Sequence, residues 1–126
     1  MKIIGTLVAL TIMVQINSAI AQGRSYLCTD PKSSFTMNFL VHKKTKSIVH
    51  VSSLSPSTGQ RFVLNENLNI VHFDDESAIA KEFSVNKTNV MFLVFNFSRL
   101  TLTTSNHVLD KKKSPRSSLY ECVINQ

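Results

Sequence analysis

Apolar and polar residues alternate over short stretches of this chain, with the period of two residues that is typical of half-buried β-strands. The first clear stretch is 35–41, Phe-Thr-Met-Asn-Phe-Leu-Val, and a second one begins at residue 47 and extends to residue 54. The run Ser55-Pro56-Ser57-Thr58-Gly59 then combines Pro and Gly in the strongest turn signal of the sequence. The pattern therefore predicts a hairpin over residues 35–54, followed by a tight turn.

The second half of the chain continues this pattern, and at 126 residues the whole chain has room for one domain. Further strands are expected at 61–64, 68–73, 83–85, 90–97, 100–103 and 119–124. The acidic run 74–77 could cap one helical turn over 78–82, and a connecting loop is the alternative there. No stretch sustains the 3.6-residue period of a helix. The sequence therefore predicts an all-β fold, a small antiparallel barrel or sandwich of six to eight short strands with at most one short helical turn.

The first 21 residues have the features of a secretory signal peptide. Lys2 provides a positive start, an apolar run extends to residue 16, and Ala19-Ile20-Ala21 has the small-x-small pattern that a signal peptidase accepts. A retained membrane anchor is the alternative, but the run is shorter than the roughly 20 residues that a span needs. We expect cleavage after Ala21 and a soluble, secreted or periplasmic domain of residues 22–126 without a transmembrane anchor.

The two cysteines, Cys28 and Cys122, lie near the two ends of the expected mature domain. In an exported protein an even number of cysteines favours a disulfide. A redox pair would normally have C-x-x-C spacing, and a metal site would need further ligands. The sequence therefore predicts a Cys28–Cys122 bond, with the first and last strands side by side or facing each other.

The sequence lacks the residue motifs of several kinds of functional site. Three glycines cannot supply Gly-rich phosphate loops, dinucleotide fingerprints or a G-x-S-x-G elbow. The acidic run at 74–76 lacks the alternating ligands and the glycine of a calcium loop. None of the four histidines has zinc-site spacing: His42, His50, His72 and His107. We expect no catalytic residues, metal or cofactor; an enzyme would need the fold to join His50 or His72 to an acid and a hydroxyl in a cleft.

Positive charge gathers in two expected loops. The chain carries 14 Lys+Arg against 8 Asp+Glu, a net charge of +6 that becomes +5 without Lys2. The clustered cations are Lys43, Lys44 and Lys46 at the tip of the first hairpin, and Lys111, Lys112, Lys113 and Arg116 in a later polar loop. If the loops converge, they form an anion-binding patch for a polysaccharide or a lipid headgroup. Export and the lack of aromatic residues among the cations argue against nucleic acid. The alternative is that these lysines only keep the protein soluble.

One local segment carries a family resemblance. Thr58-Gly59-Gln60-Arg61-Phe62 is similar to the S-G-x-[RK]-[YF] segment of the periplasmic C-type lysozyme inhibitors, and the chain also resembles small exported single-disulfide β proteins of bacteria. The inhibitors are small β-barrels in which a serine and a nearby basic residue enter the lysozyme cleft. The resemblance implies that Thr58 takes the place of that serine and that Arg61 is the basic residue.

The sequence thus predicts an exported, non-enzymatic β-domain with a binding or structural role, which would use its polar loops for recognition. The expected partner is a protein or an anionic polymer in the cell envelope or outside the cell. Lysozyme inhibition and the binding of anionic surfaces through the basic loops are the two alternatives.

Overall fold

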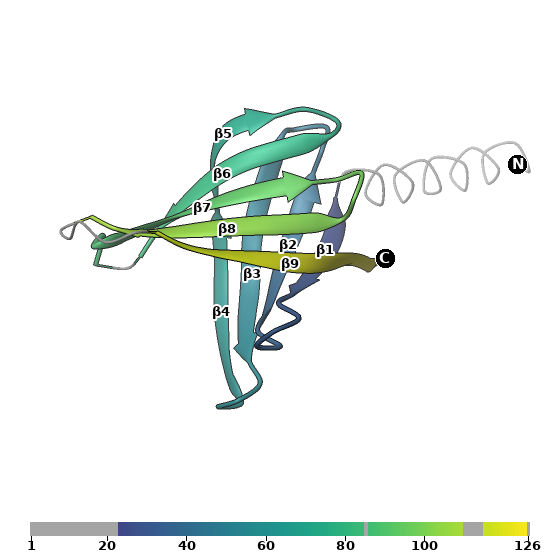
Figure 1. Ribbon diagram of the computed structural model, residues 1–126. Coiled ribbons are helices and arrows are strands. Elements are labelled where there is room, and N and C mark those ends of the chain that lie inside the picture. The colour runs from purple at the N-terminus through teal and green to yellow at the C-terminus, as the bar shows by residue number, and fades with distance from the viewer. Residues whose placement is uncertain (1–22, 85, 110–114, 126) are drawn as a thin grey trace, which may run out of the picture.

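A computed structural model describes residues 23–84, 86–109 and 115–125 of the chain. These residues form nine antiparallel strands and no helix, in one strongly curled, open half-barrel sheet (Figure 1). The strands are β1 (Arg24–Thr29), β2 (Thr36–His42), β3 (Ser47–Ser55), β4 (Gln60–Asn67), β5 (Asn69–Phe73), β6 (Ser77–Phe83), β7 (Asn89–Asn96), β8 (Thr101–Val108) and β9 (Arg116–Asn125). Their order in the sheet is β4-β3-β2-β1-β9-β8-β7-β6-β5.

The two edge strands are neighbours in the chain, which gives the sheet its curl. Leu68 alone separates β4 from β5, so residues 60–73 act as one bent strand that pairs with β3 before the bend and with β6 after it. Leu68 is buried, and its amide donates a hydrogen bond to the carbonyl oxygen of Ile48 at 2.9 Å. This hydrogen bond connects the bend to β3. The outer edges of β4 and β5 remain unpaired among the described strands.

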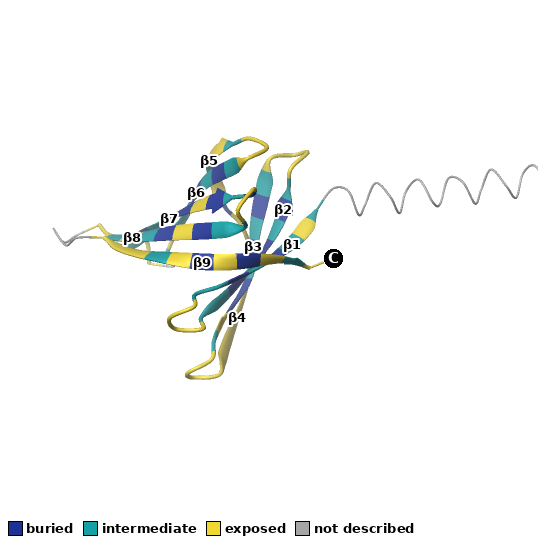
Figure 2. Ribbon diagram, turned by 45° about the vertical axis from the view of Figure 1, so that its right-hand side comes forward, coloured by how far each residue is buried: buried dark blue, intermediate teal, exposed yellow. Residues whose placement is uncertain are grey.

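The core lies on the concave side of the curl, where alternate residues of the strands point (Figure 2). Aromatic side chains from the two halves of the sheet meet there: Phe39 of β2 packs edge-on against Phe95 of β7, with ring centroids 5.1 Å apart. Fully burying one such side chain contributes about 1.5–3 kcal/mol. The alternation read from the sequence therefore defines the inner face of the sheet.

The predicted disulfide is confirmed. Cys28 and Cys122 stand directly opposite each other in the register of β1 and β9 and are bonded. The first and last strands therefore lie side by side. A disulfide is typical of proteins in oxidising compartments.

The strand count and several elements differ from the sequence prediction. No strand is predicted at β1, β8 extends to Val108 beyond the predicted 100–103, and the predicted strand 83–85 is not seen as such, since Phe83 ends β6 and Val85 lies outside the described residues. The structure has nine strands instead of six to eight, and residues 78–82, expected as a helical turn or a loop, belong to strand β6. Ala, Lys and Glu favour helices, so this stretch carries little strand signal. However, β6 pairs with both β5 and β7 and buries Ala78 and Ala80 completely. Pairing on both sides outweighs the intrinsic preference.

The architecture is also neither of the two that were expected, since an open half-barrel is not a closed barrel or a sandwich. The expected signal peptide, residues 1–21, lies outside the described residues. Within the described part of the chain, no helix has the length and apolarity needed to cross a lipid bilayer.

Candidate functional site

The most buried polar side chain among the described residues is His50 on β3, which is 2% exposed. Its Nδ1 lies 2.8 Å from Oε2 of Glu82 on β6, and its Nε2 lies 2.9 Å from Oγ of Ser53. The imidazole also stacks on Phe39, with ring centroids 4.6 Å apart. Both ring nitrogens are therefore occupied, and a flat apolar contact fixes the ring plane.

A β-bulge explains how Ser53 reaches His50. Residues three apart on a regular strand point to opposite faces of the sheet. In the pairing of β2 with β3, His50 stands opposite Phe39 while Ser52 stands opposite Asn38, so Val51 is an extra residue. The extra residue reverses the alternation, and both His50 and Ser53 point to the concave side.

The order acid, histidine, serine is that of a nucleophilic triad, but the surroundings do not give it a substrate site. Ser53 is only 7% exposed. A pocket of about 180 Å³ reaches Glu82, yet its lining includes neither His50 nor Ser53. His50 thus bonds to an acid and a hydroxyl, and neither this pocket nor one at the start of β1 is lined by His50 or Ser53.

The same three residues have a clear structural role. β3 and β6 are not neighbours in the sheet, so the His50–Glu82 bond crosses the concave side and links the two halves of the half-barrel. We refer to His50, Ser53 and Glu82 as the His50 clamp. His50 is a candidate from the sequence alone, whereas Glu82 is not, because the sequence does not predict β6 as a strand.

The described cations of the expected basic patch lie at two ends of the sheet. Lys43, Lys44 and Lys46 occupy the exposed turn between β2 and β3. Arg116 begins β9, whose other end pairs with the start of β1, and β1 begins beside the end of β2. Arg116 is therefore at the far end from the lysine turn. Lys111, Lys112 and Lys113 lie outside the described residues.

Thr58 and Arg61 lie together on the β3–β4 hairpin, which projects from the body of the molecule (Figure 1). Thr58 is in the turn and accepts a hydrogen bond from the amide of Gln60 at 3.3 Å. Gly59 follows with φ +69°, a conformation that favours glycine. Arg61 begins a stretch of β4 with two exposed apolar residues, Phe62 at 49% and Val63 at 67%.

No metal site is evident in the described ranges, where no group of three His, Cys, Asp or Glu side chains is placed to hold an ion. A comparison with protein-family models, curated proteins and solved structures finds no match to this chain. Function is therefore inferred from its own residues and geometry.

The acidic turn between β5 and β6 has one carboxylate with a well-defined role. Asp74 accepts hydrogen bonds from the His72 ring and from the amides of Ser77 and Glu76, each at 2.8 Å. The His72 bond, followed by the two amide bonds, lowers the pKa of Asp74 from 3.8 to about 2.

This shift predicts a pH dependence of stability. Because the folded pKa lies below the unfolded value, the Asp74 carboxylate stabilises the fold above about pH 4, and this contribution is lost as the pH falls towards 2. We expect thermal melts between pH 5 and 2 to fall less steeply for Asp74→Asn than for the wild type. Asp75→Asn in the same turn is the matched control and should follow the wild type. Identical slopes for all three proteins would contradict the assignment.

Proposed function

We propose that this protein is an exported, non-enzymatic binding module that recognises a protein partner through its β3–β4 hairpin. The observation that supports this is the exposed pair Phe62 and Val63 beside Arg61 on a projecting edge strand. Aromatic residues and arginine are enriched at the energetic centres of interfaces. Successive residues of a strand point to opposite faces, so each face of the projecting strand presents one exposed apolar side chain to a partner.

The edge position of β4 distinguishes Phe62 and Val63 from exposed apolar residues on strands that are paired on both sides. Leu119 on β9 is 55% exposed, but β9 is paired on both sides, by β1 and by β8. β4 is paired only with β3 among the described strands, so its outer edge presents backbone groups to a partner. An extended partner segment could therefore add to this edge and contact the apolar side chains at the same time.

Export is supported by two observations. The Cys28–Cys122 bond fits an oxidising compartment, and the first 21 residues have signal-peptide composition. The proposal therefore includes secretion or a periplasmic location. Its partner would then lie in the cell envelope or outside the cell.

A lysozyme-type enzyme is a specific second candidate for the partner. The two residues that the inhibitor resemblance singles out, Thr58 and Arg61, are both on the projecting hairpin, as insertion into a cleft would require. The chain has no Trp, so the Trp-containing second motif of that family is missing, and its positive charge opposes approach to a basic lysozyme. The general proposal therefore does not depend on lysozyme.

The proposal predicts a loss of binding without a loss of fold. Covalent cross-linking in the extracellular and envelope fractions of the producing cells, followed by mass spectrometry, identifies the captured partner. The double variant Arg61→Ala with Phe62→Ser should weaken the binding of that partner at least tenfold. Its melting temperature should stay close to that of the wild type, since both side chains are exposed.

Leu119→Ser is the matched control, because it removes a similarly exposed apolar side chain from a strand that is paired on both sides. It should bind as the wild type does. Equal binding by all three proteins would contradict the hairpin as the recognition element. In a separate arm, inhibition of a C-type lysozyme that Thr58→Ala or Arg61→Ala abolishes would support the second candidate, and no inhibition at micromolar protein would remove it.

A further inference from the structure

The end of the half-barrel opposite the β3–β4 hairpin contains a pocket of about 210 Å³, where β1 begins and β2 ends. Arg24, Tyr26, Val41 and Lys43 line it. We propose that this pocket binds a small organic anion, a carboxylate or a phosphate monoester with an apolar body, between Arg24 and Lys43. The proposal does not rest on the β3–β4 hairpin.

Strand register places Arg24 on the concave side, and the contact of Lys43 with the buried Phe97 ring places Lys43 there too. On β1 the buried residues Tyr26 and Cys28 alternate along the inner face, and Arg24 continues this row towards the open end. On β2 the inner row includes Val41, which stands directly opposite Arg24. Lys43 follows two residues later. Two inward rows that are apolar in the core thus each end on a positive charge at the mouth of the pocket.

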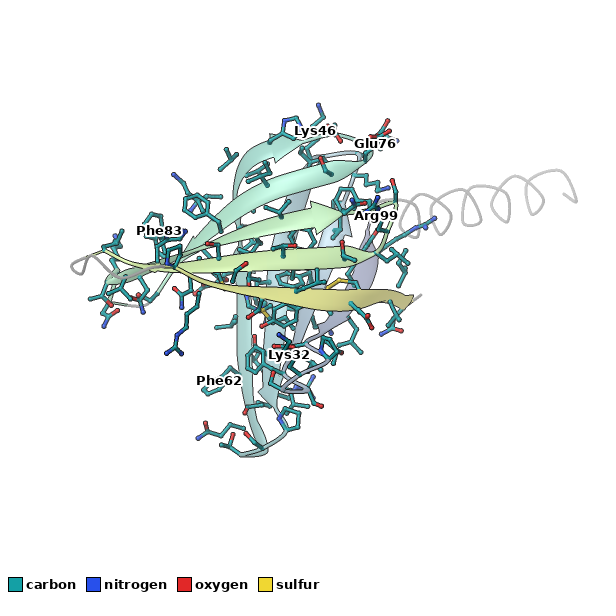
Figure 3. The ribbon with its side chains drawn as sticks, in the orientation of Figure 1. Lys32, Lys46, Phe62, Glu76, Phe83 and Arg99 are labelled. Carbon is teal, nitrogen blue, oxygen red and sulfur yellow. A yellow bond between two sulfur atoms is a disulfide. The ribbon has the colours of Figure 1, made fainter. Side chains whose placement is uncertain are left out.

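These two charges have no carboxylate partner within the part of the chain that the structure describes. The ion pairs there are His50–Glu82 and His72–Asp74. Acidic residues do lie at the same end, in the β5–β6 turn (Figure 3), but Asp74 is held by His72 and by the turn amides. Two like charges that line one small pocket repel each other, and a bound anion would turn that repulsion into attraction on both sides.

Tyr26 lines the pocket and the buried Phe97 ring lies behind it, and these rings set the class of ligand. Lys43 Nζ lies 4.8 Å from the centroid of the Phe97 ring, and Tyr26 packs edge-on against the same ring at 5.9 Å. Burial raises the pKa of the Tyr26 phenol, while the charge of Arg24 acts in the opposite direction. The phenol therefore remains protonated at neutral pH and can donate a hydrogen bond to an anion. An anion with an aromatic or apolar body would use the two cations together with Tyr26 and Val41, which line the pocket.

The test is an NMR titration of the full mature, disulfide-bonded protein at low ionic strength in a phosphate-free buffer. The probes are inorganic phosphate, phenyl phosphate and benzoate. We expect saturable shifts centred on Tyr26, Val41 and Phe97, with phenyl phosphate binding more tightly than inorganic phosphate. A preference for phenyl phosphate over benzoate assigns the site to phosphate monoesters, and the reverse preference assigns it to carboxylates.

Arg24→Gln and Lys43→Gln should each weaken binding about tenfold, since each removes one charge-assisted contact. Lys32→Gln is the matched control, because Lys32 is an exposed lysine at the other end of the sheet (Figure 3), and it should leave the affinity unchanged. Melting temperatures of the variants should stay near the wild-type value, because both cations are exposed. Shifts that do not saturate, or that Lys32→Gln weakens as much as Lys43→Gln does, would overturn the proposal.

Discussion

Replacement of both cysteines by alanine should lower the free energy of unfolding by about 2–5 kcal/mol and the melting temperature by about 10–25 °C. The bond joins residues 94 positions apart, so its loss releases nearly the whole domain in the unfolded state. A domain of this size has a total stability of about 5–15 kcal/mol, so the loss is a large fraction of it. Thermal and denaturant unfolding of Cys28→Ala with Cys122→Ala measures the effect.

Alanine is the suitable replacement because both positions are buried, and a serine hydroxyl there would add a desolvation cost of its own. Reduction of the wild-type disulfide provides the control, since it opens the same loop without a substitution. Both samples should lose similar stability and retain their β-sheet circular dichroism in mild conditions. An unchanged melting temperature in both would show that the hydrogen bonds between β1 and β9 hold the two ends without the covalent link.

The second large effect is expected at the His50 clamp, where His50→Ala should cost about 3–5 kcal/mol. The substitution removes the ring stacked on Phe39 and leaves the mostly buried Glu82 side chain without its partner across the concave side. Ser53→Ala removes a single neutral hydroxyl and should cost only about 0.5–1.5 kcal/mol. Denaturant unfolding of the single variants measures this order.

A double-mutant cycle separates the clamp from simple packing. His50→Ala and Glu82→Ala should be strongly non-additive, because either change alone already breaks the bond between β3 and β6. Glu82→Gln is the conservative variant, since it keeps the size and a hydrogen-bonding oxygen, and should cost less than Glu82→Ala. Additive costs for His50→Ala and Glu82→Ala would contradict a clamp and would assign the loss to the ring contacts of His50 alone.

Local patterns identified most of the strands, because successive residues of a strand face opposite sides of the sheet and therefore alternate between apolar and polar. The predicted stretches 35–41 and 90–97 correspond closely to β2 and β7. The break expected between the predicted strands 61–64 and 68–73 was placed too early: Asn65 sits inside β4 with φ +48°, and β4 ends at Asn67. The polar composition of residues 65–67 suggests a break between two strands. Pairing with β3, which is distant in the sequence, nevertheless keeps these residues within β4.

Local sequence patterns likewise reveal only those parts of the candidate sites that lie close together in the chain. Thr58 and Arg61 were found from a local segment, and they lie on one hairpin because only a turn separates them. Glu82 was missed because its link to His50 spans 32 residues and two strands that are not adjacent in the sheet. The pairing of Arg24 with Lys43 at one pocket likewise depends on the register of β1 against β2.

Three features of this protein are predictable from its sequence alone: the all-β fold, the pairing of the two cysteines, and the hairpin formed by a Pro-Gly turn. Each of these follows from nearest-neighbour alternation, from turn chemistry or from the number of cysteines. The open curl, the clamp and the separation of the lysine turn from Arg116 follow from long-range strand pairing. The curl depends on the bend at Leu68, the clamp on the bulge at Val51, and the separation on the pairing of β1 with β2 and β9. One extra residue or one change of partner strand redirects the side chains that follow.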